Sequence, residues 1–256
     1  RYASRGLGDV YKRQELLNRF LKLDCSRMDF FRINYVATNK MNLLAGSTGF
    51  LGNKILKELA DNEMPTVAVC RRAIPNLPNN TRELIIDFDC LHDIEISQID
   101  HVYLALGYPL YFHNVMGFIN TTLKENLFKV DFNYQLEIAK KCQEAGAKHI
   151  SIISAVGADP NSWNYYLKIK GMLEREIIKL GFESTNIFRP GHLLGNKFRL
   201  DIRLADLASF IVDPFLHGSF KKFRSISAKK LSAFVVNHKG KKEATNYFEF
   251  NDFIKD

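Results

Sequence analysis

A serine, a tyrosine and a lysine are spaced so that they could protonate a carbonyl oxygen during its reduction. Ser154 ends a short apolar run, and Tyr166 and Lys170 follow 12 and 16 residues later. Tyr166 and Lys170 are four residues apart, so on a helix they share one face. An ammonium group stabilises a neighbouring phenolate and would move the tyrosine pKa from near 10 toward neutrality. A serine hydroxyl at the strand end could hold the substrate oxygen.

Taken alone, a tyrosine and a lysine four residues apart are also typical of an ordinary amphipathic helix face. The pair gains meaning from a glycine loop about 100 residues earlier, at Gly46, Gly49 and Gly52. This loop follows an apolar run and opens a helical pattern, which is the context in which glycines cradle a pyrophosphate at a helix N-terminus. The spacing G-x-x-G-x-x-G departs from G-x-G-x-x-G, and a turn that binds nothing is the alternative.

The residues after the second predicted strand bear on the choice between nicotinamide cofactors. NAD-binding proteins usually place an acid about 20 residues past the glycines to hold the ribose 2′-hydroxyl. Here Gly52 is followed 19 residues later by Arg71 and Arg72, and no acid lies between Cys70 and Glu83. Two guanidinium groups suit a 2′-phosphate, whereas a solvated basic pair is the alternative. We therefore expect NADP(H) in preference to NAD(H).

Apolar runs and helical patterns alternate along the chain and must position these groups. The predicted strands are Asn42–Ala45, Thr66–Cys70, Leu84–Ile86, His101–Leu106, His149–Ser154 and Ser184–Phe188. The predicted helices between them are Phe50–Asp61, Asn126–Ala145 and Tyr165–Leu180. After Arg189 the alternation weakens, with helical patterns at Asp201–Phe215 and Ala228–Asn237 and a late strand at Asn246–Phe250. This order predicts an α/β fold: a Rossmann-type doubly wound parallel sheet with helices on both faces and a small C-terminal substrate-binding part.

Six pieces of sequence in this order resemble the short-chain dehydrogenase/reductases, in particular the atypical NAD(P)H-binding branch that includes the Tat-interacting oxidoreductase. They are GSTGFLG (Gly46–Gly52), VCRR (Val69–Arg72), IDF (Ile86–Phe88), SAVGAD (Ser154–Asp159), YLKIK (Tyr166–Lys170) and FRPG (Phe188–Gly191). The resemblance covers roughly 150 residues from Met41 to about Leu194. Ala155 and Val156 depart from the two serines seen in many relatives, which removes a second hydroxyl from the polar side of the substrate site.

The resemblance implies a role for each matching residue. The pyrophosphate would lie against Gly46, Thr48, Gly49, Phe50, Leu51 and Gly52, and the 2′-phosphate against Arg71 and Arg72. Asp87 and Phe88 would border the adenine, and Leu106 and Gly107 the adenosine ribose. Ser154 would hold the substrate oxygen, Tyr166 would donate the proton and Lys170 would bind the nicotinamide ribose. Pro190, Gly191, His192 and Leu193 would pass beside the nicotinamide.

Composition and charge exclude several other classes of protein. The net charge of +8 arises mostly in residues 1–40, which hold nine basic and four acidic side chains and leave only +3 for the remainder. That remainder has no electrostatic footprint for nucleic acid. Four scattered cysteines and seven scattered histidines show no metal-ligand spacing, and no apolar run is long enough to span a bilayer. We expect a cytoplasmic protein with no nucleic-acid, membrane or metal partner, for which a homo-oligomer stays open.

The first 40 residues fit poorly with the rest and are expected to be a non-native or disordered leader. Arg1–Gln14 resembles the translated library adapter found at the ends of metagenomic reading frames, with a genuine basic extension as the alternative. Met28 and Met41 are both candidate starts. Residues 41–256 are then expected to form a single NAD(P)-binding domain.

Three functions remain open for that domain. The first is an NADP(H)-dependent oxidoreductase that transfers hydride to or from a small carbonyl or alcohol, with Tyr166 as proton donor. The second is a non-catalytic protein that binds NADP(H) as a structural or sensing ligand. The third is an enzyme like the nucleotide-sugar epimerases, which share the serine, tyrosine and lysine but usually carry a larger C-terminal lobe than the residues after Gly191 provide.

Overall fold

Seven parallel strands form one sheet at the centre of the computed structural model, which describes residues 41–111, 114, 119–196, 200–238 and 244–255. Side chains of Asp93 and of residues 200–205 lie outside this description, as do all predictions made for residues 1–40. The strands are β1 (Met41–Ala45), β2 (Thr66–Cys70), β3 (Thr81–Ile85), β4 (Ile99–Leu104), β5 (His149–Ile153), β6 (Ser184–Phe188) and β9 (Thr245–Phe248). Their spatial order is β3-β2-β1-β4-β5-β6-β9. The predicted Rossmann-type α/β fold is therefore confirmed.

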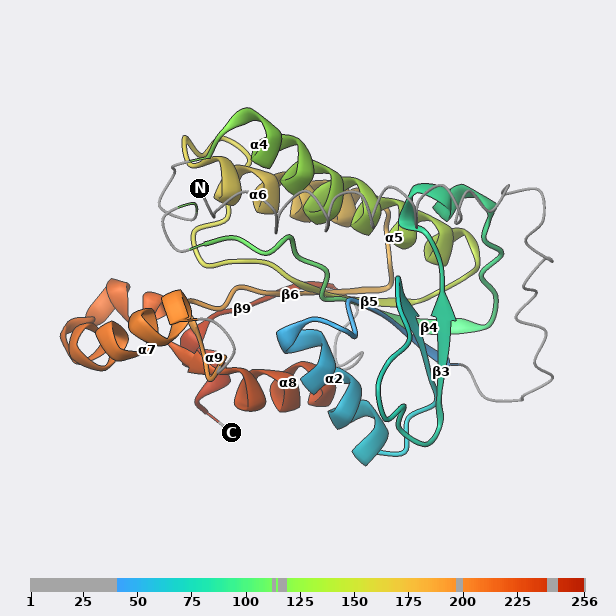
Figure 1. Cartoon of the computed structure of the whole chain (residues 1–256), viewed down its shortest axis with the longest axis horizontal. Coiled ribbons are helices and arrows are strands. Elements are labelled where there is room, and N and C mark those ends of the chain that lie inside the picture. The colour runs from blue at the N-terminus through green and yellow to red at the C-terminus, as the bar shows by residue number, and fades with distance from the viewer. Residues whose placement is uncertain (1–40, 112–113, 115–118, 197–199, 239–243, 256) are drawn as a thin grey trace, which may run out of the picture.

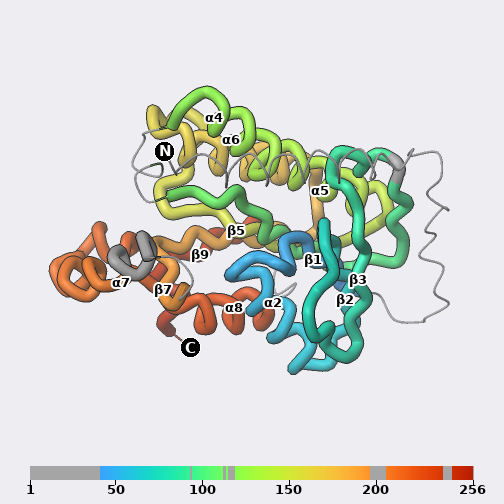
Figure 2. Tube along the Cα trace, in the orientation of Figure 1, coloured from blue at the N-terminus to red at the C-terminus, as the bar shows by residue number. Residues whose placement is uncertain are grey.

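Two apolar cores cover the two faces of this sheet, because every central strand carries apolar side chains on both sides. On one face lie α4 (Thr121–Phe128), α5 (Tyr134–Glu144) and α6 (Tyr165–Lys179), with Ile138, Leu173 and Ile177 in the core. The other face is covered by α2 (Phe50–Asp61) and α8 (Ala228–Asn237). Figures 1 and 2 show these two helical layers on opposite sides of the strands.

The strand order reverses at β1, which pairs with β2 on one side and with β4 on the other. In open parallel sheets, the crevice at such a reversal, beyond the carboxyl ends of the strands, is where dinucleotides bind. The glycine loop follows β1 directly, so the fold places it at this point.

One long helix differs from its prediction at its start and in its middle. It begins at Thr121, five residues before the predicted start, because the Asn120 side chain accepts a hydrogen bond from the Leu123 amide and caps it. A π-helical turn, η3 (Lys129–Asn133), joins α4 to α5. Such turns insert an extra residue into a helix and are frequent at functional sites. This turn carries Asp131, which is buried.

The C-terminal part adds a small second sheet and a helix at one end of the molecule. The strands β7 (Leu193–Leu194) and β8 (Ile226–Ser227) pair in parallel, and α7 (Leu200–Val212) lies between them in sequence. Two 3-10 turns, η4 (Asp213–Phe215) and η5 (Gly218–Phe223), follow α7, and a short helix, α9 (Phe250–Phe253), ends the chain. Figure 1 shows α7, in orange, at the end of the molecule opposite β3. A fourth short turn, η2 (Phe88–Asp93), follows β3.

Candidate functional site

The glycine loop is built so that two of its positions accept no side chain. Gly46 has a φ of +96°, and a Cβ there would fall well inside the van der Waals radius of the Ala105 carbonyl. A Cβ on Gly52 would overlap the Gly46 carbonyl oxygen. The first glycine therefore permits the turn beside β4, and the third permits α2 to pack against the loop.

The start of α2 leaves its backbone donors unpaired by side chains. Gly49 is the N-cap residue and provides no side-chain hydrogen bond, and the first turn holds no acidic residue. Free N–H groups and the positive end of the helix dipole make such a terminus an anion site. The cradle and its unused donors fit the diphosphate of a dinucleotide.

The other predicted residues of the loop contribute in different ways. Thr48 and Phe50 are partly exposed, whereas the Leu51 side chain is 7% exposed and packs in the core with Ile55 and Leu59. Leu51 can therefore face a pyrophosphate only through its backbone. The Ser47 hydroxyl is buried and has no hydrogen-bond partner in the described part of the chain.

The carboxyl ends of β2 and β3 carry the residues predicted for the adenosine half. Arg71 and Arg72 are both exposed just after β2. Asp87 is exposed, and its carboxylate accepts the Asp89 amide. The Phe88 ring instead lies in the core, 3% exposed, edge-on to Tyr134. Its side chain is therefore not available to cover an adenine, which corrects the sequence-based expectation for this ring.

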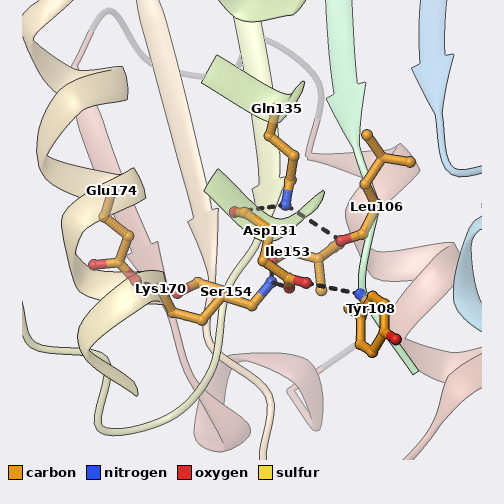
Figure 3. A network of polar contacts seen from close by, with 8 residues as sticks. All are labelled: Leu106, Tyr108, Asp131, Gln135, Ile153, Ser154, Lys170 and Glu174. Carbon is orange, nitrogen blue, oxygen red and sulfur yellow. Dashed lines mark hydrogen bonds and ion pairs between the residues drawn. The ribbon is translucent and has the colours of Figure 1, made fainter. Parts of the chain in front are cut away.

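Lys170 forms a buried ion pair that the sequence did not predict. Its Nζ lies 2.8 Å from Asp131 Oδ1, and the two side chains are 5% and 3% exposed. The other Asp131 oxygen accepts the Tyr108 amide at 2.7 Å. Gln135 Nε2 donates to the carbonyls of Asp131 and Leu106, so the π-helical turn, α6 and the end of β4 form one network (Figure 3).

This network places two predicted ribose-side residues beside the catalytic candidates. Leu106 and Gly107 follow β4, and a Cβ on Gly107 would lie 3.8 Å from Asp131 Oδ1. Lys170 Nζ also lies 3.4 Å from the Ile153 carbonyl at the end of β5. The lysine thus stands between the ends of β4 and β5, at the carboxyl edge of the sheet, as its predicted position on α6 requires.

Tyr166 lies on the same face of α6, and the Lys170 ammonium is 5.9 Å from the centroid of its ring. Burial raises the pKa of Tyr166, Lys170 lowers it and Asp131 raises it, with a net upward shift. Burial lowers the pKa of Lys170, but Asp131 and Tyr166 raise it more. The expectation that Lys170 brings the Tyr166 pKa toward neutrality is therefore wrong for this arrangement, because burial and Asp131 outweigh the ammonium. A phenol of this kind stays protonated at neutral pH.

The Ser154 hydroxyl does not adopt the substrate-binding role that the sequence predicted. Its Oγ donates to Glu174 Oε1 on α6, and Glu174 accepts Arg189 Nε at 2.9 Å and is paired through its second oxygen with Arg189 Nη2. A hydroxyl has one proton, so a serine that donates to a carboxylate can only accept from another group. In this arrangement Ser154 cannot donate to a substrate carbonyl oxygen, and the buried carboxylate explains why, since it requires donors.

The segment after β6 runs beside the small sheet. The Pro190 carbonyl accepts the Val156 amide, and a Cβ on Gly191 would lie 2.7 Å from the Arg224 carbonyl. Leu193 pairs with Ile226 in the sheet of β7 and β8. His192 Nε2 lies 2.6 Å from Asp206 Oδ1 on α7, so this histidine is held by the C-terminal part and is not a freely solvated loop residue.

Four charged residues of this region were not predicted from the sequence. They are Asp131, Glu174, Arg189 and Asp206. A signal existed for two of them: Asp131 lies between two apolar residues in a predicted helix, and Glu174 lies four residues after Lys170 on the same predicted face. Nothing local identified Arg189 or Asp206 as partners, because their contacts join distant parts of the chain.

Neither a metal site nor a membrane-spanning helix is found among the described residues. No group of histidines, cysteines and carboxylates there could hold a metal ion. In the same part of the chain, no helix combines the length and the hydropathy that crossing a bilayer requires.

Comparison with solved structures places this arrangement among known folds. The structure of MoeE5 in complex with UDP-glucose and NAD superimposes with a TM-score of 0.60 over 84% of this chain and 79% of that one, at 15% sequence identity. At that identity the likeness shows the fold alone. No family model matches the sequence.

Two curated proteins illustrate the relatives found by sequence. The mitochondrial protein FMP52 of Kluyveromyces lactis is 33% identical over 158 residues, which are 60% of this chain and 68% of that protein. The protein HTATIP2 of Rattus norvegicus is 28% identical over 170 residues, 64% of this chain and 66% of its own length. The second supports the resemblance to the Tat-interacting branch.

The names of the FMP52 relatives overturn one expectation. Those from Kluyveromyces lactis, Eremothecium gossypii and Candida albicans are all named mitochondrial, which contradicts the expectation of a cytoplasmic protein. That expectation rested on scattered cysteines and the lack of a long apolar run, and neither feature distinguishes one reducing compartment from another.

With 33% identity over more than two thirds of the Kluyveromyces lactis protein, the chain belongs to the FMP52 family.

Proposed function

We propose that the chain is an NADP(H)-dependent oxidoreductase that reduces a small carbonyl compound, with Tyr166 as the proton donor. The observation that carries this proposal is the pairing of Tyr166 with the buried Lys170 on one face of α6, at the sheet edge where the glycine loop also lies. When bound, the nicotinamide supplies or accepts the hydride. The likeness to MoeE5, whose structure holds NAD, supports a fold that takes a nicotinamide dinucleotide.

Different residues of this chain would bind different parts of the dinucleotide. Gly46, Gly49 and Gly52 with the α2 terminus would bind the diphosphate, and Arg71 and Arg72 would bind the 2′-phosphate of NADP(H). Both arginines are exposed, and neither forms an ion pair within the described part of the chain. Arg71 interacts electrostatically with the Asp89 carboxylate, and both guanidinium groups are open to solvent, where they could form charge-assisted hydrogen bonds with a phosphate.

Tyr166 would give its proton to the oxygen of the carbonyl compound as that oxygen gains negative charge. The upward shift of its pKa keeps the phenol protonated at neutral pH, which suits the direction of reduction. Lys170 would hold the adjacent ribose and stabilise the phenolate left behind. Because Ser154 donates to Glu174, we assign it no donor role toward the substrate.

One observation favours a second candidate, a protein that binds NADP(H) without turnover. The Lys170 charge is neutralised by Asp131, and the only Ser154 proton is taken by Glu174. Both groups would have to exchange partners for the serine and the lysine to act together on a substrate. A binding protein would need no such exchange.

A pair of neighbouring tyrosines provides the test. The full chain is assayed for NADPH oxidation with a panel of aliphatic and aromatic aldehydes and ketones. Tyr166→Phe should lower the rate by about 100-fold or more while NADPH binding is kept. Tyr165→Phe is the matched control, since the Tyr165 hydroxyl only donates weakly to the Lys124 carbonyl, and it should keep the rate.

The outcomes separate the two candidates. Full activity of Tyr166→Phe would show that Tyr166 is not the proton donor. NADPH binding by the unaltered chain with no turnover across the panel would favour the binding protein.

We also infer, from the names of the FMP52 relatives, that the protein acts in mitochondria. Fractionation of cells that produce the native protein tests this.

A further inference from the structure

Three aromatic residues lie on the two loops that leave neighbouring strands at the carboxyl edge of the sheet. Tyr108 and Tyr111 follow β4, and Trp163 lies on the loop between β5 and α6. Because β4 pairs with β5, the two loops start side by side. Trp163 is 88% exposed and Tyr111 is 58% exposed, whereas Tyr108 is partly exposed. We call these three residues the aromatic rim.

The aromatic rim is tied to the catalytic candidates. The Tyr108 amide donates to Asp131, which holds Lys170, and Figure 3 shows the Tyr108 ring next to this pair. Trp163 lies three residues before Tyr166, so their Cα atoms are at most about 11 Å apart. A ring attached to a carbonyl group at the Tyr166 hydroxyl is then within the combined reach of these two side chains.

The loop that carries Trp163 is held firmly, although the indole itself is exposed. The Asp159 carbonyl accepts the Ser162 amide, and the Asp159 carboxylate accepts the Asn161 amide. A Cβ on Gly171 would overlap the Asp159 backbone, so the loop packs directly against α6. An aromatic side chain on a fixed loop loses little conformational entropy when a ligand covers it. Such rigid aromatic anchors are typical of binding sites.

The first residues after β5 offer few hydrogen bonds to a hydroxylated substrate. Ser154 gives its only proton to Glu174, and Ala155 and Val156 carry no polar side-chain atom. A sugar-like substrate needs several directed donors and acceptors, whereas a planar apolar ring needs mainly contact area. This edge of the sheet therefore favours an apolar, planar substrate.

We propose that the substrate is a carbonyl compound with an aromatic ring, which stacks on Trp163 while Tyr166 protonates the carbonyl oxygen; this inference rests on the oxidoreductase function proposed above. Tyr108 and Tyr111 would contact the same ring from the neighbouring loop. A saturated ring of the same size would fit the space but lose the stacking contact.

Two aldehydes with rings of equal size test the proposal in the full chain. Phenylacetaldehyde and cyclohexylacetaldehyde differ in the planarity of the ring, while neither carbonyl group is conjugated with it. The ratio of their kcat/KM values should favour phenylacetaldehyde by about fivefold or more, and Trp163→Leu should reduce this preference to about twofold or less. Trp163→Phe keeps an aromatic ring and should retain most of the preference. Because Trp163 is exposed, both variants should keep the unfolding midpoint of the unaltered chain.

The fluorescence of Trp163 gives a second readout, which needs no turnover. Trp163 is the only tryptophan of the chain, so tryptophan emission reports on this position alone. With NADP+ bound, 2-phenylethanol should shift the emission to shorter wavelength, because its ring covers the exposed indole. At the same concentration, 2-cyclohexylethanol should shift it less.

The two readouts separate this inference from the proposed function. An unchanged substrate ratio in Trp163→Leu would overturn the aromatic-substrate inference and leave the oxidoreductase function standing. Equal emission shifts with the two alcohols would also overturn it. A selective shift with 2-phenylethanol, without turnover of either aldehyde, would support the aromatic site but contradict the oxidoreductase function.

Discussion

The glycine loop and the Tyr166–Lys170 centre lie at the same edge of one sheet, yet they are built from different parts of the chain. The loop depends on the backbone: Gly46 and Gly52 have no space for a Cβ, and the α2 terminus offers bare amides. The centre depends on buried charges, with Asp131 against Lys170 and Arg189 against Glu174. A backbone cradle is fixed once the strand and helix pack. A charged centre holds only while each charge keeps its partner.

The largest effect should come from leaving one charge of the centre without its partner. Lys170→Met strands the Asp131 carboxylate in a site that is 3% exposed, and should lower the free energy of unfolding by about 3–5 kcal/mol. Replacing both residues, by Lys170→Met with Asp131→Leu, should restore most of that loss, because no charge is then buried alone. Urea unfolding measures the free energy of unfolding of both variants. A double variant as unstable as the single one would show that the ion pair does not govern this site.

Adding a side chain to the cradle should have the next largest effect, this time on nucleotide binding. Gly46→Ala forces a Cβ into the Ala105 carbonyl and should weaken NADPH binding by about 100-fold, or about 2.7 kcal/mol. Gly181→Ala is the matched control, since Gly181 also has a positive φ, of +71°, but nothing lies within 4 Å of its Cβ position. If both variants lost affinity equally, the close approach to Ala105 would not be the cause.

A change of charge without a change of shape should move the pH dependence of the centre. Asp131 raises the pKa of Tyr166, so Asp131→Asn should lower that pKa. Reduction needs protonated Tyr166, and its rate therefore falls as the pH rises through that pKa. The fall should therefore begin at a lower pH in the variant than in the unaltered chain. Glu176→Gln, which removes a partly exposed carboxylate of α6, should leave the profile unchanged. A shift of the Asp131→Asn profile toward higher pH would contradict this assignment.

The smallest effect concerns the exposed rim of the cradle, where solvent screens charges. Arg71→Gln should weaken NADPH binding by about fivefold, or about 1 kcal/mol, and leave NADH binding unchanged. Arg175→Gln, at an exposed arginine of α6, should change neither. An equal loss for both cofactors would assign Arg71 to the common part of the dinucleotide.

The contrast between the glycine loop and the charged centre also explains which parts of the molecule could be predicted from the sequence. The β2 and β6 strands match their predicted ranges because local apolar runs between turn residues define them. The loop was recognisable because a glycine requirement appears directly in the residue types. Helix α6 and its Tyr166–Lys170 face followed from spacing alone.

The charged centre could not be predicted in the same way. Asp131 meets Lys170 across 39 residues, and Arg189 meets Glu174 across 15, so both pairs depend on how helices pack over the sheet. The direction of the Ser154 hydroxyl depends in turn on Glu174. Leu207, Phe210 and Ile211 of α7 also had the spacing of a buried face, and only the structure showed that these three side chains are exposed.

The most direct test of the account is a titration of the full chain with NADPH and NADH, followed by the fluorescence of each reduced nucleotide. We predict that NADPH binds and that NADH binds at least tenfold more weakly, a difference of about 1.4 kcal/mol. If neither nucleotide binds, the glycine loop is a structural turn, and the proposed oxidoreductase function is wrong.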